Sequence, residues 1–164
     1  MSSYVIADFF EVKDDKNIYH LMVNKVSPSL KRLLLGYRLP EDIPEVKLSS
    51  GIETEIKTML TEKDSDRIEF FNSQSFRSYL DITRERYRLK SLEYFRKTEA
   101  LNLIDYMKLT DEEKENVDTT IDDVKTELEG LEETIECLLS VLGIFEIFET
   151  NESGSIYMAV SYDY

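Results

Sequence analysis

The sequence holds few side chains that could act as a nucleophile or as a soft metal ligand. Among 164 residues there is one histidine, His20, and one cysteine, Cys137. A nucleophilic triad or a zinc centre needs several such groups in one place, so neither residue can form one alone. We expect His20 to lie in the middle of a strand and Cys137 on the flank of a helix. With one cysteine, no intramolecular disulfide can form.

The glycines and acids give no motif for catalysis either. Gly51, Gly130, Gly143 and Gly154 stand far apart, and none belongs to a phosphate loop, a dinucleotide fingerprint or a calcium loop. The 34 acidic residues could still supply a carboxylate-dependent metal site, because such a site needs few well-placed acids. We keep that class as an alternative and predict a non-enzyme with no catalytic residue, no cofactor and no metal.

A basic segment of the chain is followed directly by a strongly acidic one. The net charge of −14 divides into −3 over residues 1–66, +4 over 67–97 and −15 over 98–164. This distribution disfavours general binding to DNA or to an anionic membrane. Because no basic leader precedes an apolar run and no run of 18 uncharged apolar residues occurs, we expect a cytoplasmic protein, in the host cytoplasm if it is viral.

Four runs of β-branched and aromatic residues predict strands at about 4–12, 18–26, 144–149 and 156–162. Polar turns separate the members of each pair, so each pair is predicted to form a β-hairpin. Isolated hairpins are marginal in water, and we therefore expect them to join in one antiparallel sheet that helices cover on one face.

Four helices are predicted at about 28–35, 51–63, 73–108 and 110–142. Ser50 and Thr110 each begin a capping-box pattern, and Gly143 is a plausible helix C-cap. The residues just before position 73 are ambiguous between a short strand and a turn. The third helix repeats apolar residues every seven positions, at Leu80, Tyr87, Tyr94 and Leu101, and Phe76, Ile104 and Met107 add to the same side.

The fourth helix has the strongest periodic pattern in the chain, an apolar heptad seam with alternating spacings of four and three. Its members are Val117, Ile121, Val124, Leu128, Leu131, Ile135, Leu138 and Leu142. A tight corner at Leu109 predicts that the third and fourth helices form an antiparallel hairpin whose seams bury each other, with paired positions summing to about 218. The fold class is α+β: one domain over 1–164, in which an antiparallel sheet of N-terminal and C-terminal β-hairpins packs with a long antiparallel helical hairpin and two shorter helices.

Basic and aromatic residues alternate over 77–97, a pattern found where proteins bind single-stranded nucleic acid. The predicted hairpin, however, sets Arg84 and Arg88 near Thr134 and Gly130, and Arg96 near Asp122, among many acids. We therefore interpret the basic residues as partners in salt bridges along the hairpin and the aromatics as seam residues. Direct binding of nucleic acid is not expected.

Eight acidic residues line the outside of the helix predicted over 110–142, which carries a net charge of −10 over about 50 Å. Four of them recur every seven residues at heptad position b, and the others take neighbouring outer positions. This density approaches a sparse single DNA strand, which carries about one charge per 3.4 Å. The stripe comprises Glu115, Asp118, Asp122, Asp123, Glu129, Glu132, Glu133 and Glu136.

These features predict a protein that acts by binding another protein. The specific hypothesis is a small acidic inhibitor of the phage or mobile-element anti-defence type, such as an anti-CRISPR or a nuclease or polymerase inhibitor, occupying a partner's basic nucleic-acid-binding groove. Tyr157, Tyr162 and Tyr164 are candidate aromatic anchors. A first alternative is a homo-oligomeric scaffold, for instance a homodimer, that pairs through the heptad helix or a sheet edge. The carboxylate-dependent metal enzyme is the second.

Overall fold

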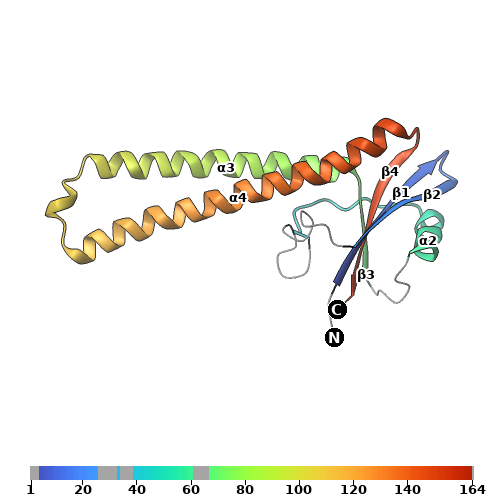
Figure 1. The fold of residues 1–164 in the computed structure, drawn as a ribbon, viewed down its shortest axis with the longest axis horizontal. Coiled ribbons are helices and arrows are strands. Elements are labelled where there is room, and N and C mark those ends of the chain that lie inside the picture. The colour runs from blue at the N-terminus through green and yellow to red at the C-terminus, as the bar shows by residue number, and fades with distance from the viewer. Residues whose placement is uncertain (1–3, 26–32, 34–38, 61–66, 164) are drawn as a thin grey trace. The chain divides into compact units, whose positions relative to one another are not determined.

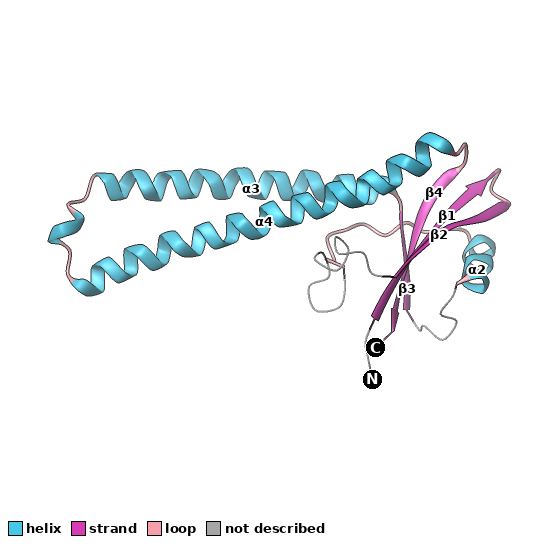
Figure 2. Ribbon diagram, viewed as in Figure 1, coloured by secondary structure: helices cyan, strands magenta, loops and turns pink. Residues whose placement is uncertain are grey.

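The structure is a computed structural model that describes residues 4–25, 33, 39–60 and 67–163. Four strands and three α-helices follow one another within these residues (Figures 1 and 2). In chain order they are β1 (Tyr4–Lys13), β2 (Asn17–Lys25), α2 (Ser50–Met59), β3 (Arg67–Phe71), α3 (Ser73–Asn102), the 3-10 helix η1 (Tyr106–Lys108), α4 (Asp111–Asn151) and β4 (Ser155–Asp163).

The strands form one antiparallel sheet in the order β2-β1-β4-β3. Strands β1 and β2 are the predicted N-terminal hairpin, closed by a tight turn in which Asp14 and Asp15 both have φ of 55°. That left-handed backbone is typical of hairpin turns whose twist matches the strands. Strand β4 lies between β1 and β3, so the two central strands come from opposite ends of the chain (Figure 1).

The predicted C-terminal hairpin is wrong, because residues 144–149 are the end of α4 and not a strand. The helix continues through Gly143, so Phe145 and Phe148 project from the same side of it. The centroids of both rings lie within 5.5 Å of the centroid of the Phe9 ring of β1. A six-residue apolar run is compatible with a strand or a helix, and this contact selects the helix. Strand β3, which the sequence left ambiguous, pairs with β4 on the side opposite to β1.

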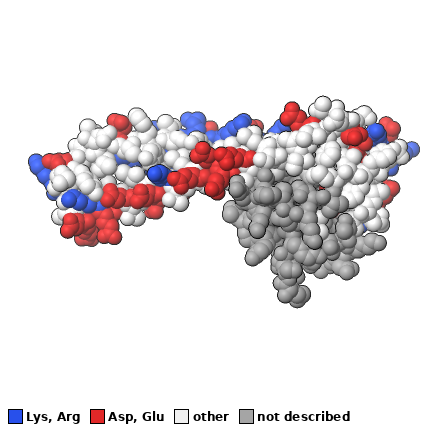
Figure 3. All heavy atoms as spheres, in the orientation of Figure 1, with Lys and Arg blue, Asp and Glu red and all other residues white. Residues whose placement is uncertain are grey.

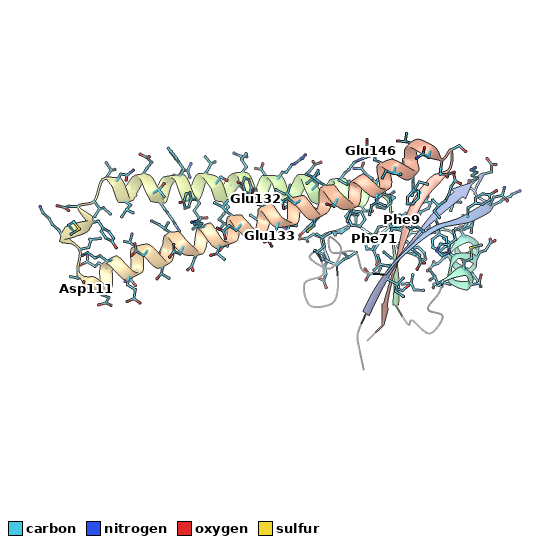
Figure 4. All side chains as sticks on the ribbon, in the orientation of Figure 1. Phe9, Phe71, Asp111, Glu132, Glu133 and Glu146 are labelled. Carbon is cyan, nitrogen blue, oxygen red and sulfur yellow. The ribbon has the colours of Figure 1, made fainter. Side chains whose placement is uncertain are left out.

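Both faces of the sheet are buried, which corrects the expectation of helices on one face. Phe9 and Phe10 point to opposite faces because side chains alternate along a strand, and neither is more than 1% exposed. Phe10 belongs to a core with Ile56 and Leu60, from α2 and its end. Phe9 packs against Phe145 of α4, and the labelled Phe71 packs against the first turn of α3 through Phe76 (Figure 4).

The helix ends differ from the predicted ones. Helix α3 ends at Asn102 instead of 108, and η1 with its flanking residues replaces the predicted tight corner at Leu109. The capping box at Thr110 is confirmed: the Glu113 N–H donates to Thr110 Oγ1 at 3.1 Å, and the Thr110 N–H donates to Glu113 Oε1 at 3.4 Å. At α2 the N-cap is Ser49 without a side-chain cap bond, so the capping box at Ser50 is wrong.

The helix predicted over 28–35 lies outside the described residues except for position 33. The helix predicted over 51–63 is shorter than expected, because α2 ends at Met59 and Leu60 is already extended. The chain divides into two compact units. We call Met1–Leu80 with Glu136–Tyr164 the sheet unit and Asp81–Ile135 the hairpin unit. The antiparallel α+β architecture with a helical hairpin is confirmed, while a single domain over 1–164 stays a prediction.

Candidate protein-binding surface

The hairpin unit consists of the distal parts of α3 and α4, which run antiparallel, and of their connection. Lys90 Nζ of α3 lies 2.6 Å from Glu127 Oε2 of α4, and these positions sum to 217, close to the predicted 218. The seam is nevertheless shallow: of the 55 residues in this unit, Thr83 and Val124 alone are buried. Two helices cover each other along one stripe, so most of each surface faces solvent.

Cations of α3 find acids on their own helix, which corrects part of the predicted salt-bridge pattern. Arg88 donates to both carboxylate oxygens of Glu85, at 2.6 and 3.0 Å, instead of reaching α4. Glu93 accepts from Lys90 and Lys97, each at 3.0 Å, and these hydrogen bonds lower the pKa of the Glu93 carboxyl. Pairs three or four residues apart on one helix are the least costly to form, because both side chains already project from the same face.

All eight residues of the predicted acidic stripe are exposed. Among the described residues, Asp118 accepts a hydrogen bond from the Tyr106 hydroxyl at 2.9 Å, and the other seven carboxylates form no hydrogen bond or ion pair. Figure 3 shows acidic side chains along α4, and Figure 4 labels Glu132 and Glu133 on it. Seven of the eight lie in the hairpin unit; Glu136 is the first residue of α4 in the sheet unit.

Most of the stripe lies on the side of α4 away from Glu127, the residue that Lys90 contacts. Glu127 precedes Glu129 by two residues, which is about 200° around the helix axis. Asp122 lies two turns before Glu129 and shares its side of the helix. Of the stripe residues, Asp123, one turn before Glu127, lies nearest to the side that Lys90 contacts.

The end of the hairpin unit adds apolar surface beside these charges. Ile104 is 46% and Met107 79% exposed, so the prediction that they extend the α3 seam is wrong; Leu103 beside Ile104 is 89% exposed. The helix stops at Asn102, before the seam could reach them. A groove of about 280 Å³ opens next to them between α3 and α4; it is lined by Lys97, Ala100, Leu101, Ile104, Asn116, Val117, Thr120 and Ile121.

The predicted aromatic anchors are not joined to the stripe. Tyr157 is half-buried on β4 and belongs to the sheet unit. The side chains of Tyr162 and Tyr164 lie outside the described residues. Sequence reasoning also missed exposed apolar side chains on the outside of α3, where Leu89 is 53% and Phe95 60% exposed. A second heptad spacing on α3 would have found Leu89, whereas Phe95 lies about 120° away from it around the helix axis.

The titratable residues of the sheet have structural partners. His20 Nε2 lies 2.9 Å from Asp8 Oδ1, and its ring stacks on Phe10. Burial raises the pKa of the Asp8 carboxyl, although the hydrogen bond from His20 opposes this. Glu11 accepts the Gly154 N–H at 2.8 Å and so fastens the turn before β4. Within the described part of the chain, no three His, Cys, Asp or Glu side chains are grouped to hold a metal ion.

No protein-family model matches the chain, and searches of curated proteins and of solved structures also find no match. In the described ranges, every helix is too short or too polar to cross a lipid bilayer. Function is therefore inferred from the surface of the chain itself.

Proposed function

We propose that this chain is a non-catalytic protein-binding protein, a small acidic inhibitor of the anti-defence type made by phages and mobile elements. Its acidic stripe would occupy the basic nucleic-acid-binding groove of a partner such as a CRISPR effector, a nuclease or a polymerase. The observation that carries the proposal is the set of seven exposed carboxylates on the outer face of α4 that have no partner in the described structure. Each is available to a Lys or Arg of the partner without first breaking an internal bond.

Charge spacing supports a resemblance of the stripe to a single strand more than to a duplex. Asp111–Ile135 holds eleven acidic and two basic residues, a net charge of −9 over about 37 Å, or roughly one charge per 4 Å. A single DNA strand carries about one charge per 3.4 Å and a duplex about one per 1.7 Å. The stripe therefore suits a groove built for a single strand better than one built for a duplex. Such complementarity acts mainly on the association rate and on specificity.

The test is a pull-down from the lysate of the native host, nuclease-treated and washed at low and high salt. The stripe variant carries Asp122→Lys, Glu129→Lys and Glu136→Lys. Its matched control carries Glu55→Lys, Asp81→Lys and Glu152→Lys, which changes the net charge by the same amount at acids outside the stripe. We expect the wild type and the control to capture a basic nucleic-acid-binding protein that high salt releases, and the stripe variant to lose it.

Two further measurements separate charge imitation from a general loss of folding or binding. Thermal unfolding of the stripe variant should match the wild type closely, because exposed unpaired carboxylates contribute little to stability. Adding a single-stranded oligonucleotide should displace the captured protein, since both compete for one groove. Capture that persists in the stripe variant, or that the oligonucleotide leaves intact, would contradict the proposal.

A further inference from the structure

The face of α3 opposite α4 carries a second heptad seam with large exposed apolar side chains. The residues Ile82, Leu89 and Leu92 are 40%, 53% and 39% exposed, although they are large and apolar. Together with the polar residues between them, they are spaced alternately by three and four residues, as in the seam of α4. We call this set the outer seam: Ile82, Glu85, Leu89, Leu92, Arg96, Glu99 and Leu103.

The outer seam lies on the opposite side of α3 from the seam that faces α4. Leu89 follows Tyr87 of the inner seam by two residues, about 200° around the axis. Helix α3 therefore has two apolar stripes, and α4 covers one of them. Because α4 covers only one of these two stripes, the other is open to a further helix.

The centre of the outer seam is complementary to itself in the antiparallel direction. About the midpoint between Lys90 and Ser91, Leu89 is the counterpart of Leu92, and Glu85 is the counterpart of Arg96. Two α3 helices related by a twofold axis at this midpoint would set leucine against leucine and carboxylate against guanidinium, each pairing occurring twice. A parallel pair in register would instead set Glu85 against Glu85 and Arg96 against Arg96.

We propose that the outer seam joins two copies of this chain in an antiparallel helix pair whose twofold axis passes between Leu89 and Leu92. Charge complementarity selects a second copy, because the same helix supplies both members of each ion pair. The layer beyond, Ile82 against Glu99, mixes an apolar with an acidic side chain, so the apolar contact is confined to the centre and the dimer is weak. This interface goes beyond the proposed inhibitor function, since the acidic stripe on α4 contributes no residue to it.

Sedimentation equilibrium of the full chain over a wide range of concentrations tests the proposal with Glu85→Arg, Arg96→Glu and the double variant. We expect the wild type to dimerise reversibly and each single variant to raise the dissociation constant about tenfold or more, because each places two like-charged pairs in the dimer. The double variant restores opposite charges and should regain the wild-type constant. Restoration cannot come from helix stability, because the Glu85–Arg88 pair stays broken in the double variant.

A matched control, Glu133→Arg, reverses an exposed charge on α4 and should leave the dissociation constant unchanged. Circular dichroism checks that every variant keeps its helices. A wild type that stays monomeric at all concentrations, a dimer insensitive to the single reversals, or a double variant that remains monomeric would each overturn the proposed interface.

Discussion

The sheet unit and the hairpin unit differ in where their apolar side chains lie. The ten largest fully buried side chains all belong to the sheet unit, among them the phenylalanines Phe9, Phe10, Phe71, Phe76 and Phe145. The hairpin unit buries Thr83 and Val124 and exposes seven large apolar residues. A sheet covered on two faces concentrates burial, whereas two helices alone cannot. The sheet unit therefore contributes most of the stability of the fold, and the hairpin unit carries most of the large exposed apolar side chains.

The hairpin unit compensates with local interactions. The Glu85–Arg88 and Glu93–Lys97 pairs each join side chains three or four residues apart and so favour the helix locally. The capping box at Thr110 adds about 1 kcal/mol at the start of α4. Such terms maintain two helices without requiring them to bury their outer faces, which is how a long apolar stripe can stay exposed.

The largest expected effect contrasts a core residue of the sheet unit with a seam residue of the hairpin unit. Phe145→Ala removes a fully buried ring that touches Phe9 and Phe76, and should lower the free energy of unfolding by about 3–5 kcal/mol. Leu131→Ala removes a half-buried side chain and should lower it by about 1–2 kcal/mol. Urea unfolding of both variants measures the difference; equal losses would show that the hairpin seam is as tightly packed as the sheet core.

Two glycines provide a smaller contrast with opposite signs. A Cβ at Gly154 would lie 2.7 Å from the Val12 carbonyl oxygen and 2.8 Å from Glu11 Cγ, so Gly154→Ala should destabilise the protein by about 1–3 kcal/mol. Gly130 lies inside α4 with open space around it, and Gly130→Ala should stabilise by about 1 kcal/mol. The midpoints of thermal unfolding of the two variants should shift in opposite directions from that of the wild type. A loss of stability in Gly130→Ala would indicate that this part of α4 is not a regular helix.

Local patterns were predictable from sequence, and long-range contacts were not. The capping box at Thr110 and the α4 seam depend on residues within a few turns, and the register predicted from a turn near Leu109 agrees with the Lys90–Glu127 contact although the connection is longer than predicted. The end of α4 depends on Phe145 meeting Phe9, more than 130 positions earlier in the chain. Strand β3 has five residues and gains its identity by pairing with β4.

The candidate site shows the same division. Heptad spacing placed the acidic stripe on the outside of α4, and all its members are exposed. Spacing does not reveal whether the cations of α3 neutralise the stripe, because a cation can pair with an acid of either helix. Arg88 pairs with Glu85 of its own helix. The outer seam of α3 is visible in the sequence, but two overlapping seams on one helix look like a nonspecific mixture until exposure separates them.

The smallest effects are expected from two carboxyls whose contributions to stability depend on pH in opposite directions. Burial raises the pKa of Asp8 above its ordinary 3.8, so the folded state binds this proton more tightly than the unfolded state. The contribution of Asp8 is therefore largest below pH 3.8 and is lost as pH rises through the folded pKa. Asp8→Asn keeps an acceptor for His20 without titrating, and its stability relative to the wild type should increase over that rise.

Glu93 in the hairpin unit should respond the other way. Hydrogen bonds from Lys90 and Lys97 lower its pKa below the ordinary 4.5, so its contribution is present above pH 4.5 and is lost as pH falls through the folded pKa. Glu93→Gln should therefore lose stability relative to the wild type above pH 4.5 and match it in stronger acid, with a small amplitude because solvent screens this exposed site. Urea unfolding across the acid range measures both differences. If they had the same sign, either burial of Asp8 or the pairing of Glu93 in solution would be wrong.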